Sequence, residues 1–273
     1  MQSLTLKENV QKHYDFVSPY YKSLWGNHIH HGYYETGKES KEQAQEKLIL
    51  KLLEKLDLKK GSNVLDVGCG VGGTSLYLAE KFNCNVLGLT ISPVQIEMAR
   101  LLSKDIKNKP SFILADANNL HLSGMFDVIW AVEMTSHLEQ RKLFFERCSK
   151  MLNLGGKICI AEWLKESNLS KEQENIYIKP IEEGMLVKLP TKEEYLNYIK
   201  ENKLQLRYYD DISKNVAKTW DLCLDIIGKK DLWILAAKHG KEFISFLRSF
   251  QAMRKGFRSG NFRYALFVAE KSN

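Results

Sequence analysis

The stretch VLDVGCGVGGTS, residues 64–75, decides the fold. An apolar run that suits a buried strand ends at Gly68, Cys69 and Gly70, and a helix is predicted to start near Gly73. Glycine lets the backbone take a positive φ or approach a ligand closely. The first turn of the helix then offers unpaired N–H groups to an electronegative ligand. The stretch therefore predicts a strand–loop–helix unit that binds a ligand at the end of a strand.

Gly68, Gly70 and Gly73 also satisfy the pattern G-x-G-x-x-G, so a dinucleotide-binding enzyme is one alternative. Two features count against it. Asp66 stands two residues before the first glycine, inside the end of an apolar strand. Further on, where an acid would hold the ribose of NAD, the chain has Leu-Thr-Ile at 89–91. The glycine pattern alone is weak evidence, whereas Asp66 followed by this loop is more specific.

Short apolar runs alternate with helical patterns on both sides of this unit. Strands are predicted at 62–68, 85–90, 111–115, 126–132 and 157–163, and helices at 73–82, 92–105 and 139–152. The second helix should have Ser92 as its N-cap and Pro93 at its first position, and the third should end at Gly155–Gly156. With late strands at 204–210 and 263–270, this alternation predicts an α/β fold. Its core would be a Rossmann-like, doubly wound and mostly parallel sheet of seven strands.

The chain is expected to divide into four parts. These are an N-terminal helical lid (1–45), a ligand-binding Rossmann-like core (46–165), a helical substrate cap (166–262) that contains the strand at 204–210, and the final strand of the core sheet (263–273). Because the cap is inserted before the final strand, it should lie over the carboxyl edge of the sheet. Ligands bind at this edge in open α/β sheets.

The composition is that of an ordinary globular protein, with 273 residues, 44% of them hydrophobic and 27% charged. No apolar run approaches the ~18–20 residues that a membrane helix needs. The start, MQSLTLKENVQKHYDF, lacks the apolar centre of a signal peptide. Five scattered cysteines indicate reduced thiols. We therefore expect a cytoplasmic protein without integral membrane association.

The net charge of +7 raises the alternative of a nucleic-acid or membrane-surface protein. The lysines are dispersed among acids, as in KESKEQAQEKLILKLLEKLDLKK, residues 38–60. There they would cover the polar face of a helix whose apolar stripe is Leu48, Leu50, Leu52, Leu53 and Leu56. Dispersed charge favours a solvated surface over a binding stripe.

The glycine loop resembles the first motif of class I S-adenosylmethionine-dependent methyltransferases. Other motifs of that family follow in its order and spacing, namely GLTISPVQ (88–95), ADA (115–117), FDVIWAVEMTSH (126–137) and LNLGGK (152–157). More narrowly, the chain resembles the γ-tocopherol methyltransferase-like group of small-molecule methyltransferases. The features that carry this resemblance are the opening HYD (13–15), WGNHIHHGYY (25–34) and MRKGFRSGNFRYALFVAEK (253–271).

The resemblance implies S-adenosyl-L-methionine as the cofactor and S-adenosyl-L-homocysteine as its product. The residues it assigns to the cofactor are His31, Gly32 and Tyr33 of the lid, Asp66, Gly68 and Gly70 of the glycine loop, Thr90, Ile91 and Gln95 at the ribose, Asp116 and Ala117 at the adenine, and Val132 and Glu133 beneath the sulfonium. The wider superfamily has a carboxylate at the position of Thr90, so the ribose contact is expected mainly from Gln95. Plain strand packing is the alternative role for Ile91 and Val132.

Methyl transfer requires an aligned nucleophile, exclusion of water, and removal of a proton if the acceptor carries one. The candidate base, or substrate-orienting group, is His137, because it follows the fourth predicted strand and histidine titrates near neutral pH. Related small-molecule methyltransferases use a histidine at the matching place, sometimes with a tyrosine from the N-terminal helix. This implies Tyr14 or Tyr21 here. The alternative is a structural histidine that caps the next helix.

Substrate choice is expected in the cap, which is rich in large apolar side chains, with Trp25, Met185 and Trp220 as candidate contacts. This composition predicts a medium-sized, largely apolar or aromatic acceptor of natural-product type, methylated on N, C or O. An RNA-directed methyltransferase is one alternative. A protein that keeps the cofactor for non-methylating chemistry, such as cyclisation, is another. We expect a small-molecule partner, no nucleic acid, and a monomer or homodimer.

The segment WGNHIHHGYYE, residues 25–35, has three histidines and raises the question of a metal site. A metal needs three or four ligands that converge on one point. His30 and His31 are adjacent and would face opposite ways in an extended segment, and no cysteine or acidic pair elsewhere completes a set. No metal is therefore predicted. The resemblance instead places this segment as a lid over the cofactor, where Gly32 would permit a close approach.

Overall fold

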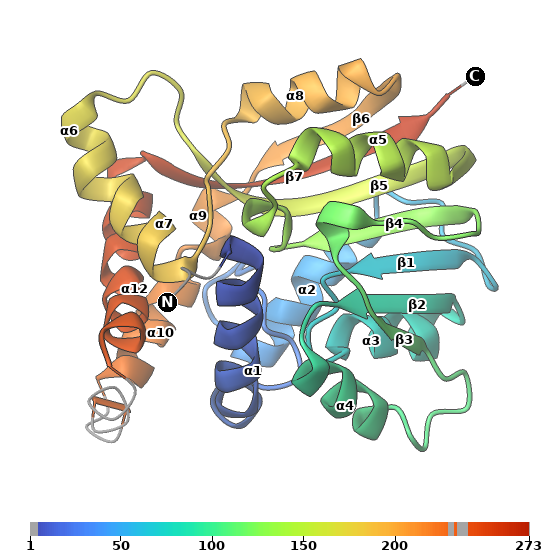
Figure 1. Cartoon of the computed structure of the whole chain (residues 1–273), viewed down its shortest axis with the longest axis horizontal. Helices are drawn as coiled ribbons and strands as arrows, with labels where there is room; N and C mark the ends of the chain where they lie inside the picture. The colour runs from blue at the N-terminus through green and yellow to red at the C-terminus, as the bar shows by residue number, and fades with distance from the viewer. Residues whose placement is uncertain (1–4, 229–231, 234–239, 273) are drawn as a thin grey trace.

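A computed structural model describes residues 5–228, 232–233 and 240–272 and shows one seven-stranded sheet between helices (Figure 1). The strand order is β3-β2-β1-β4-β5-β7-β6, and only the pairings of β7 with β5 and β6 are antiparallel. The strands are β1 (Asn63–Val67), β2 (Asn85–Thr90), β3 (Ser111–Leu114), β4 (Phe126–Val132), β5 (Leu152–Lys165), β6 (Leu204–Asp211) and β7 (Phe262–Lys271). The predicted Rossmann-like fold class and all seven predicted strands are confirmed.

The strand order reverses between β1 and β4, which are neighbours in the sheet. The chain leaves β1 toward one side of the sheet and leaves β4 toward the other, so a crevice opens beyond their carboxyl ends. The predicted glycine loop follows β1 at this point, and Glu133 follows β4.

The longer helices are α1 (Leu6–Trp25), α2 (Lys41–Leu53), α3 (Gly73–Phe82), α4 (Pro93–Leu102), α5 (Arg141–Met151), α7 (Lys179–Met185), α8 (Lys192–Glu201), α10 (Lys218–Ile227) and α12 (Lys241–Ser259). Short turns of helix lie at α6 (Lys171–Gln173), η3 (Glu174–Ile178) and α9 (Ser213–Val216). The start of α4 is as predicted, because the Ser92 side chain accepts a hydrogen bond from the Gln95 N–H and Pro93 occupies the first turn. In α1, Thr5 and Glu8 form a reciprocal capping box.

Alternating side chains divide the sheet into two buried faces. Trp130, Trp163 and Tyr264 face the side that α2, α3, α10 and α12 cover. Ile129, Ile160 and Phe267 face the side that α5 and α8 cover (Figure 1). This period of two is that of strands buried on both sides. The cap helices α7, α10 and α12 gather at one end of the sheet, beside α1 (Figure 1).

Two local predictions are wrong. The stripe predicted on α2 included Leu50, but Leu50 is 40% exposed, and Ile49 is buried instead. At about 100° per residue, Leu50 lies on the opposite side of the helix from Leu48, whereas Ile49 lies beside it. Helix α5 was expected to reach Gly155–Gly156, but it ends at Met151 and β5 begins at the next residue, because Leu152 already pairs with Phe126 of β4.

Within the described ranges, no helix is both long enough and apolar enough to cross a bilayer. The four-part division of the chain stays a prediction, although β6 of the expected cap and β7 share one sheet with the core strands.

We predict that Ile49→Ala lowers the free energy of unfolding by about 3 kcal/mol, because it removes a buried side chain and leaves a cavity. Leu50→Ala is the matched control on the same helix, and we expect it to cost less than about 0.5 kcal/mol. Urea denaturation followed by circular dichroism measures both values. Equal losses would mean that α2 does not present these faces.

Candidate active site

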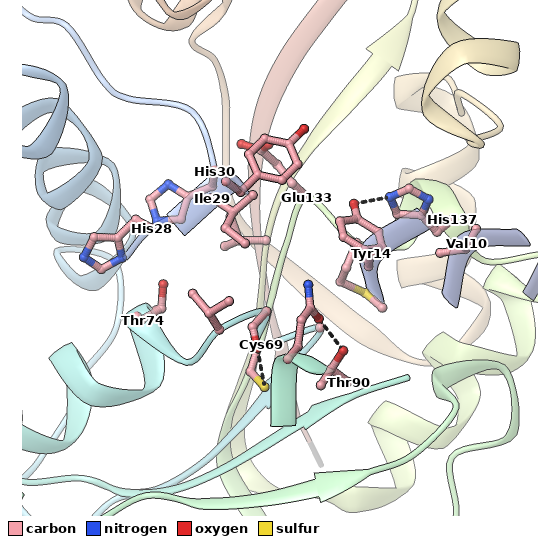
Figure 2. Close-up of a pocket in the computed structure, with 18 of the residues that line it drawn as sticks. Val10, Tyr14, His28, Ile29, His30, Cys69, Thr74, Thr90, Glu133 and His137 are labelled. Carbon is pink, nitrogen blue, oxygen red and sulfur yellow. Dashed lines mark hydrogen bonds between the residues drawn. The ribbon is translucent and has the colours of Figure 1, made fainter. Parts of the chain in front are cut away.

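A cavity opens at the carboxyl ends of β1, β2 and β4, between the core sheet, α1 and the cap (Figure 2). The loop after β1 forms one wall, with φ values of +75° at Gly68, +54° at Gly70 and +86° at Gly72. A Cβ at Gly68 would come within 2.6 Å of the Met134 side chain, so the close approach of these loops requires glycine. The N–H groups of Gly68 and Cys69 both donate to the Leu89 carbonyl at 2.9 Å, which ties the loop to β2.

Asp66 supports the loop from beneath. Its carboxylate is buried and accepts a hydrogen bond from the Ser75 hydroxyl of α3 at 2.6 Å. Burial raises the pKa of Asp66 to about 6, and the Ser75 hydrogen bond opposes that shift. This bond joins β1 to the first turns of α3 and so holds the glycine loop between them.

The segment between α1 and α2 crosses the glycine loop. A Cβ at Gly73 would lie 2.1 Å from the Asn27 carbonyl oxygen, and one at Gly70 would lie 3.5 Å from Ile29. Gln45 of α2 fixes this segment, because its amide donates to the backbone carbonyls of His28 at 2.5 Å and His30 at 3.1 Å. His28, Ile29 and His30 thereby line one side of the cavity (Figure 2).

The histidines of this segment do not converge on one point. No group of three or more His, Cys, Asp or Glu side chains with metal-binding geometry occurs among the residues that the structure describes. The ring of His30 bonds instead to the carbonyl of His31, at 2.8 Å.

Thr90 and Gln95 lie at the end of β2 and the start of α4. The Thr90 hydroxyl donates to the Gln95 side-chain oxygen at 2.6 Å, and the Gln95 amide donates to Ser18 of α1 at 3.1 Å. Asp116 lies beyond them at the end of β3 and forms an ion pair with Lys7 at 3.2 Å. Helix α1 is thus joined to this end of the cavity by both a hydrogen bond and an ion pair.

Glu133 joins the segment around His31 to the carboxyl end of the sheet. One of its carboxylate oxygens accepts from the His31 backbone N–H at 2.7 Å, the His31 Nδ1 at 2.9 Å and the Tyr264 hydroxyl at 2.8 Å. Burial alone would raise the pKa of this carboxyl, but the neighbouring His31 outweighs it and the net shift is downward. The backbone of Glu133 is left-handed, with φ +51°, an uncommon conformation for a residue with a Cβ.

Tyr14 and His137 face each other on the other side of the cavity, with 3.0 Å between the hydroxyl and Nε2 (Figure 2). The second ring nitrogen, Nδ1, lies 3.0 Å from the Leu186 carbonyl. A carbonyl only accepts, so Nδ1 carries the hydrogen. Burial lowers the pKa of His137 to about 4, so the ring is neutral at pH 7 and its Nε2 accepts from the Tyr14 hydroxyl. Burial also raises the pKa of Tyr14, which keeps the hydroxyl protonated.

Glu162 of β5 positions the turn that carries His137. Its carboxylate accepts from the Thr135 hydroxyl at 2.8 Å and the Ser136 N–H at 2.9 Å, and it is fully buried. Burial raises its pKa to about 7. Sequence reasoning missed this residue, because an acid in the middle of a strand has no local pattern. Its occurrence within the apolar run ICIAEWL was the one available signal.

The structure brings 17 of the 19 predicted site residues to this cavity. They are Tyr14, Tyr21, Trp25, His31, Asp66, Gly68, Gly70, Thr90, Ile91, Gln95, Asp116, Ala117, Val132, Glu133, His137, Met185 and Trp220. The lining that the structure describes does not include Gly32 and Tyr33. Gly32 packs on Ala44 of α2 and donates to Thr219, and the Tyr33 N–H donates to the Ala44 carbonyl. Both residues were assigned from the family resemblance, and in this structure the chain turns toward α2 after His31.

A second cavity adjoins the first. It lies among α1, α10 and α12, and it shares Tyr21, Trp25, Cys223 and Phe250 with the main cavity. The rest of its described lining consists of aliphatic and aromatic side chains, such as Leu24, Ile226 and Phe246. Sequence reasoning indicated an apolar cap but not a separate chamber.

The main cavity fits S-adenosyl-L-methionine. It is a continuous space from the glycine loop past Thr90 to Asp116, and His28 Nδ1 and His30 Nε2 are buried polar atoms beside it without a hydrogen-bond partner. A cofactor with a charged amino-acid end, a ribose and an adenine matches these polar groups in that order.

The model of the mycolic acid cyclopropane synthetase family matches residues 2–265. The chain belongs to this family, and it is an S-adenosylmethionine-dependent small-molecule methyltransferase. The predicted enzyme class and cofactor are confirmed.

Two relatives extend over most of the chain. Tocopherol O-methyltransferase, chloroplastic, of Arabidopsis thaliana is 28% identical, covering 97% of this chain and 82% of that protein. (+)-O-methylkolavelool synthase of Herpetosiphon aurantiacus is 27% identical, covering 96% of this chain and 93% of that protein.

Solved structures share the fold. Mycolic acid cyclopropane synthase CmaA1, complexed with SAH and CTAB, superposes with a TM-score of 0.87 at 22% identity, over 97% of this chain and 98% of that one. The 4+2 cyclase SpnF superposes with a TM-score of 0.85 at 22% identity, over 100% of this chain and 98% of that one.

We predict that the contribution of His137 to stability depends on pH. Its folded pKa, about 4, lies below the usual value of 6.5, so the unfolded chain binds the proton more readily. The contribution is therefore present above pH 6.5 and is lost as the pH falls toward 4. Between pH 7 and pH 5, the free energy of unfolding of wild type relative to His137→Gln should fall by about 2 kcal/mol.

Urea titrations at the two pH values measure this difference. The control is His121→Gln, which removes an exposed histidine and reports the effect of a surface substitution at each pH. A pH-independent difference for His137→Gln would mean that the ring is not held neutral.

Proposed function

We propose that the enzyme methylates a nucleophilic N, C or O of a medium-sized, largely apolar or aromatic metabolite. The observation that carries this proposal is the continuity of the site. One cavity contains the glycine loop and the Tyr14–His137 pair, and it borders an apolar chamber through shared side chains. The names of the relatives refer to small molecules, with tocopherol named for a methyltransferase and O-methylkolavelool named as the product of a synthase.

The apolar chamber supports a hydrocarbon portion in the acceptor. Phe243, Phe246 and Leu247 of α12 face Val17 and Leu24 of α1 across it. Burial of hydrocarbon in such a chamber contributes roughly 25 cal/mol per Å² of apolar surface removed from water. A polar end of the acceptor would then remain in the main cavity, where the ionisable side chains are.

The bound cofactor supplies a methyl group on a sulfonium that is already activated for displacement. We assign its methionine end to Gly68 and Gly70, its ribose to Thr90 and Gln95, and its adenine to Asp116. The support is that all five residues line the cavity in this order along the carboxyl edge of the sheet. The assignment also includes Ile91, Ala117 and Val132 as apolar contacts and Glu133 at the methyl end. It omits Gly32 and Tyr33.

We assign proton removal to the Tyr14–His137 pair. The acceptor would give its proton to the Tyr14 oxygen while the Tyr14 hydroxyl passes its own proton to Nε2 of His137. After this transfer His137 is an imidazolium, and the hydrogen on its Nδ1 is already donated to the Leu186 carbonyl. Tyr21 lines both cavities and has a different role in this scheme, as a wall of the passage between them.

The enzyme acts in this proposal without a nucleic-acid partner, as a monomer or homodimer in a cytoplasm-like compartment. Its cysteines support a reducing environment, since Cys69, Cys84, Cys148 and Cys159 are buried and unpaired. Trp25, Met185 and Trp220 are assigned to the acceptor, because each lines the main cavity from the lid or the cap.

The experiment that tests the proposal is a methylation screen of metabolite extracts with isotopically labelled S-adenosyl-L-methionine. We expect label to enter compounds that partition into organic solvent, together with release of S-adenosyl-L-homocysteine. Label found only in added RNA, or no label in any fraction at enzyme concentrations that bind the cofactor, would contradict the proposal.

We predict that His137→Ala lowers turnover by about 10²–10⁴-fold, the range for loss of a general acid–base group. Tyr14→Phe, which removes only the hydroxyl, should lower turnover by a similar factor. Affinity for S-adenosyl-L-homocysteine should change less than about 3-fold in both variants, well under the tenfold that corresponds to 1.4 kcal/mol. His121→Ala, at an exposed position, is the control. Wild-type turnover in His137→Ala with normal cofactor binding would refute the assignment.

A further inference from the structure

Among the described residues that line the main cavity, several have a buried ring nitrogen without a hydrogen-bond partner, and three of these nitrogens belong to side chains whose rings contact one another. They are Nε2 of His31 and the indole N–H groups of Trp163 and Trp220. The three side chains are almost wholly buried, with 2%, 4% and 3% of their surface exposed. Their rings contact one another, with centroid distances of 4.7 Å from His31 to Trp220, 5.8 Å from His31 to Trp163 and 6.2 Å between the tryptophans.

A buried polar group without a partner costs about 1–3 kcal/mol. Trp163 belongs to β5, Trp220 to α10 and His31 to the lid, so three separate elements bring these groups to one place. All three residues line the cavity. A ligand that satisfies them together would recover much of that cost, so the cluster points to a binding site.

Glu133 fixes which nitrogen of His31 is available. The carboxylate accepts from Nδ1, so Nδ1 carries a hydrogen and Nε2 is the ring nitrogen left without a partner. Indole nitrogens are donors only. The group that fits between them must accept a hydrogen bond from an indole and form a second one with Nε2 of His31. A hydroxyl can both accept from the indole and either donate to Nε2 or accept from it, whereas an ether or a carbonyl only accepts.

His31 packs away from the glycine loop, on the sheet and the cap. Asn27 and Ile29 lie over the glycine loop, whereas His31 packs on Trp163, Trp220 and Tyr264 of the sheet and cap. Trp220 also stacks near Phe250 at 5.6 Å, and Phe250 lines both cavities. The cluster therefore borders the passage that leads to the apolar chamber.

We propose that His31, Trp163 and Trp220 form a subsite that binds a hydroxyl group of the methyl acceptor. The inference rests on the proposed function in taking the acceptor as the ligand. It moves His31 from the methionine end of the cofactor to the acceptor, and it makes the acceptor an alcohol or phenol with an apolar portion. Glu133 and Tyr264 are positioning residues for this subsite, since they hold the His31 ring.

The test compares two probes that differ in one hydroxyl, 4-octylphenol and 4-octylanisole. Each is titrated into the full-length protein saturated with S-adenosyl-L-homocysteine, and the dissociation constant is measured by calorimetry. We expect wild type to bind the phenol at least about tenfold more tightly, which corresponds to about 1.4 kcal/mol, or one to two hydrogen bonds. Binding of both probes with equal affinity, or of neither, would overturn the proposal.

Variants of the three residues test whether the preference for the phenol over the anisole arises at this subsite. His31→Phe, Trp163→Phe and Trp220→Phe keep a ring and remove the polar atom, and each should reduce the phenol preference by at least about 3-fold. Trp233→Phe is the matched control, because its side chain is 39% exposed and its indole N–H already donates to the Ile227 carbonyl. A preference that survives in all three subsite variants would refute the assignment.

Cofactor affinity and thermal unfolding check that each variant is folded, and Trp163→Tyr is a second variant if Trp163→Phe is unstable. The two proposals fail in different ways. If the proposed methylation is wrong but the subsite exists, the protein still prefers the phenol and the variants reduce that preference, while the extract screen yields no methylated metabolite.

Discussion

The carboxylate of Glu133 is the interaction on which the site depends. It accepts hydrogen bonds from the lid at His31 and from β7 at Tyr264, and it stands at the end of β4. These three elements are far apart in the chain, and no other interaction described above joins all three. Removing a carboxylate from water is costly unless hydrogen bonds replace its hydration, and these donors replace it. The left-handed backbone at Glu133 costs about 1–3 kcal/mol and turns the side chain toward these partners.

The cavity contains two buried histidines, His137 and His31, that have different hydrogen-bond partners. The two ring nitrogens of His137 bond to a backbone carbonyl and to the Tyr14 hydroxyl. Burial lowers the pKa of His137, so the ring is neutral and its unprotonated nitrogen accepts the hydrogen bond from Tyr14. His31 bonds to a carboxylate and keeps its Nε2 without a partner. The first suits transfer of a proton through Tyr14, and the second suits recognition of a hydroxyl. In these proposals one cavity uses two histidines for two tasks, His137 for proton transfer and His31 for recognition of the methyl acceptor.

Local patterns predicted the fold well because they depend on neighbouring residues. The strands, the glycine turn and the Ser92 cap all follow from spacing within a few residues. The prediction for Leu50 was wrong because residues 48–50 are all apolar, so composition alone does not tell which of them faces the core. Glu162 and Trp163 were missed because their roles depend on partners in the short helical turn η2 (Thr135–His137), in the lid and in α10. Gly32 and Tyr33 were assigned from the family resemblance, but the path of the chain after His31 depends on its contacts with Ala44 of α2.

The place of β7 has a consequence for the order in which the molecule assembles. β7 lies between β5 and β6, so β6 has no partner in the sheet until β7 inserts beside it. A ribosome finishes β6 some fifty residues before it begins β7 (204–211 against 262–271), and until β7 is made β5 presents an open edge. Tyr264, a partner of Glu133, arrives on that same late strand. The nascent chain would therefore form its nucleotide-binding half first and close the lid only when the last strand enters, and non-local pairing of this kind is intrinsically slow.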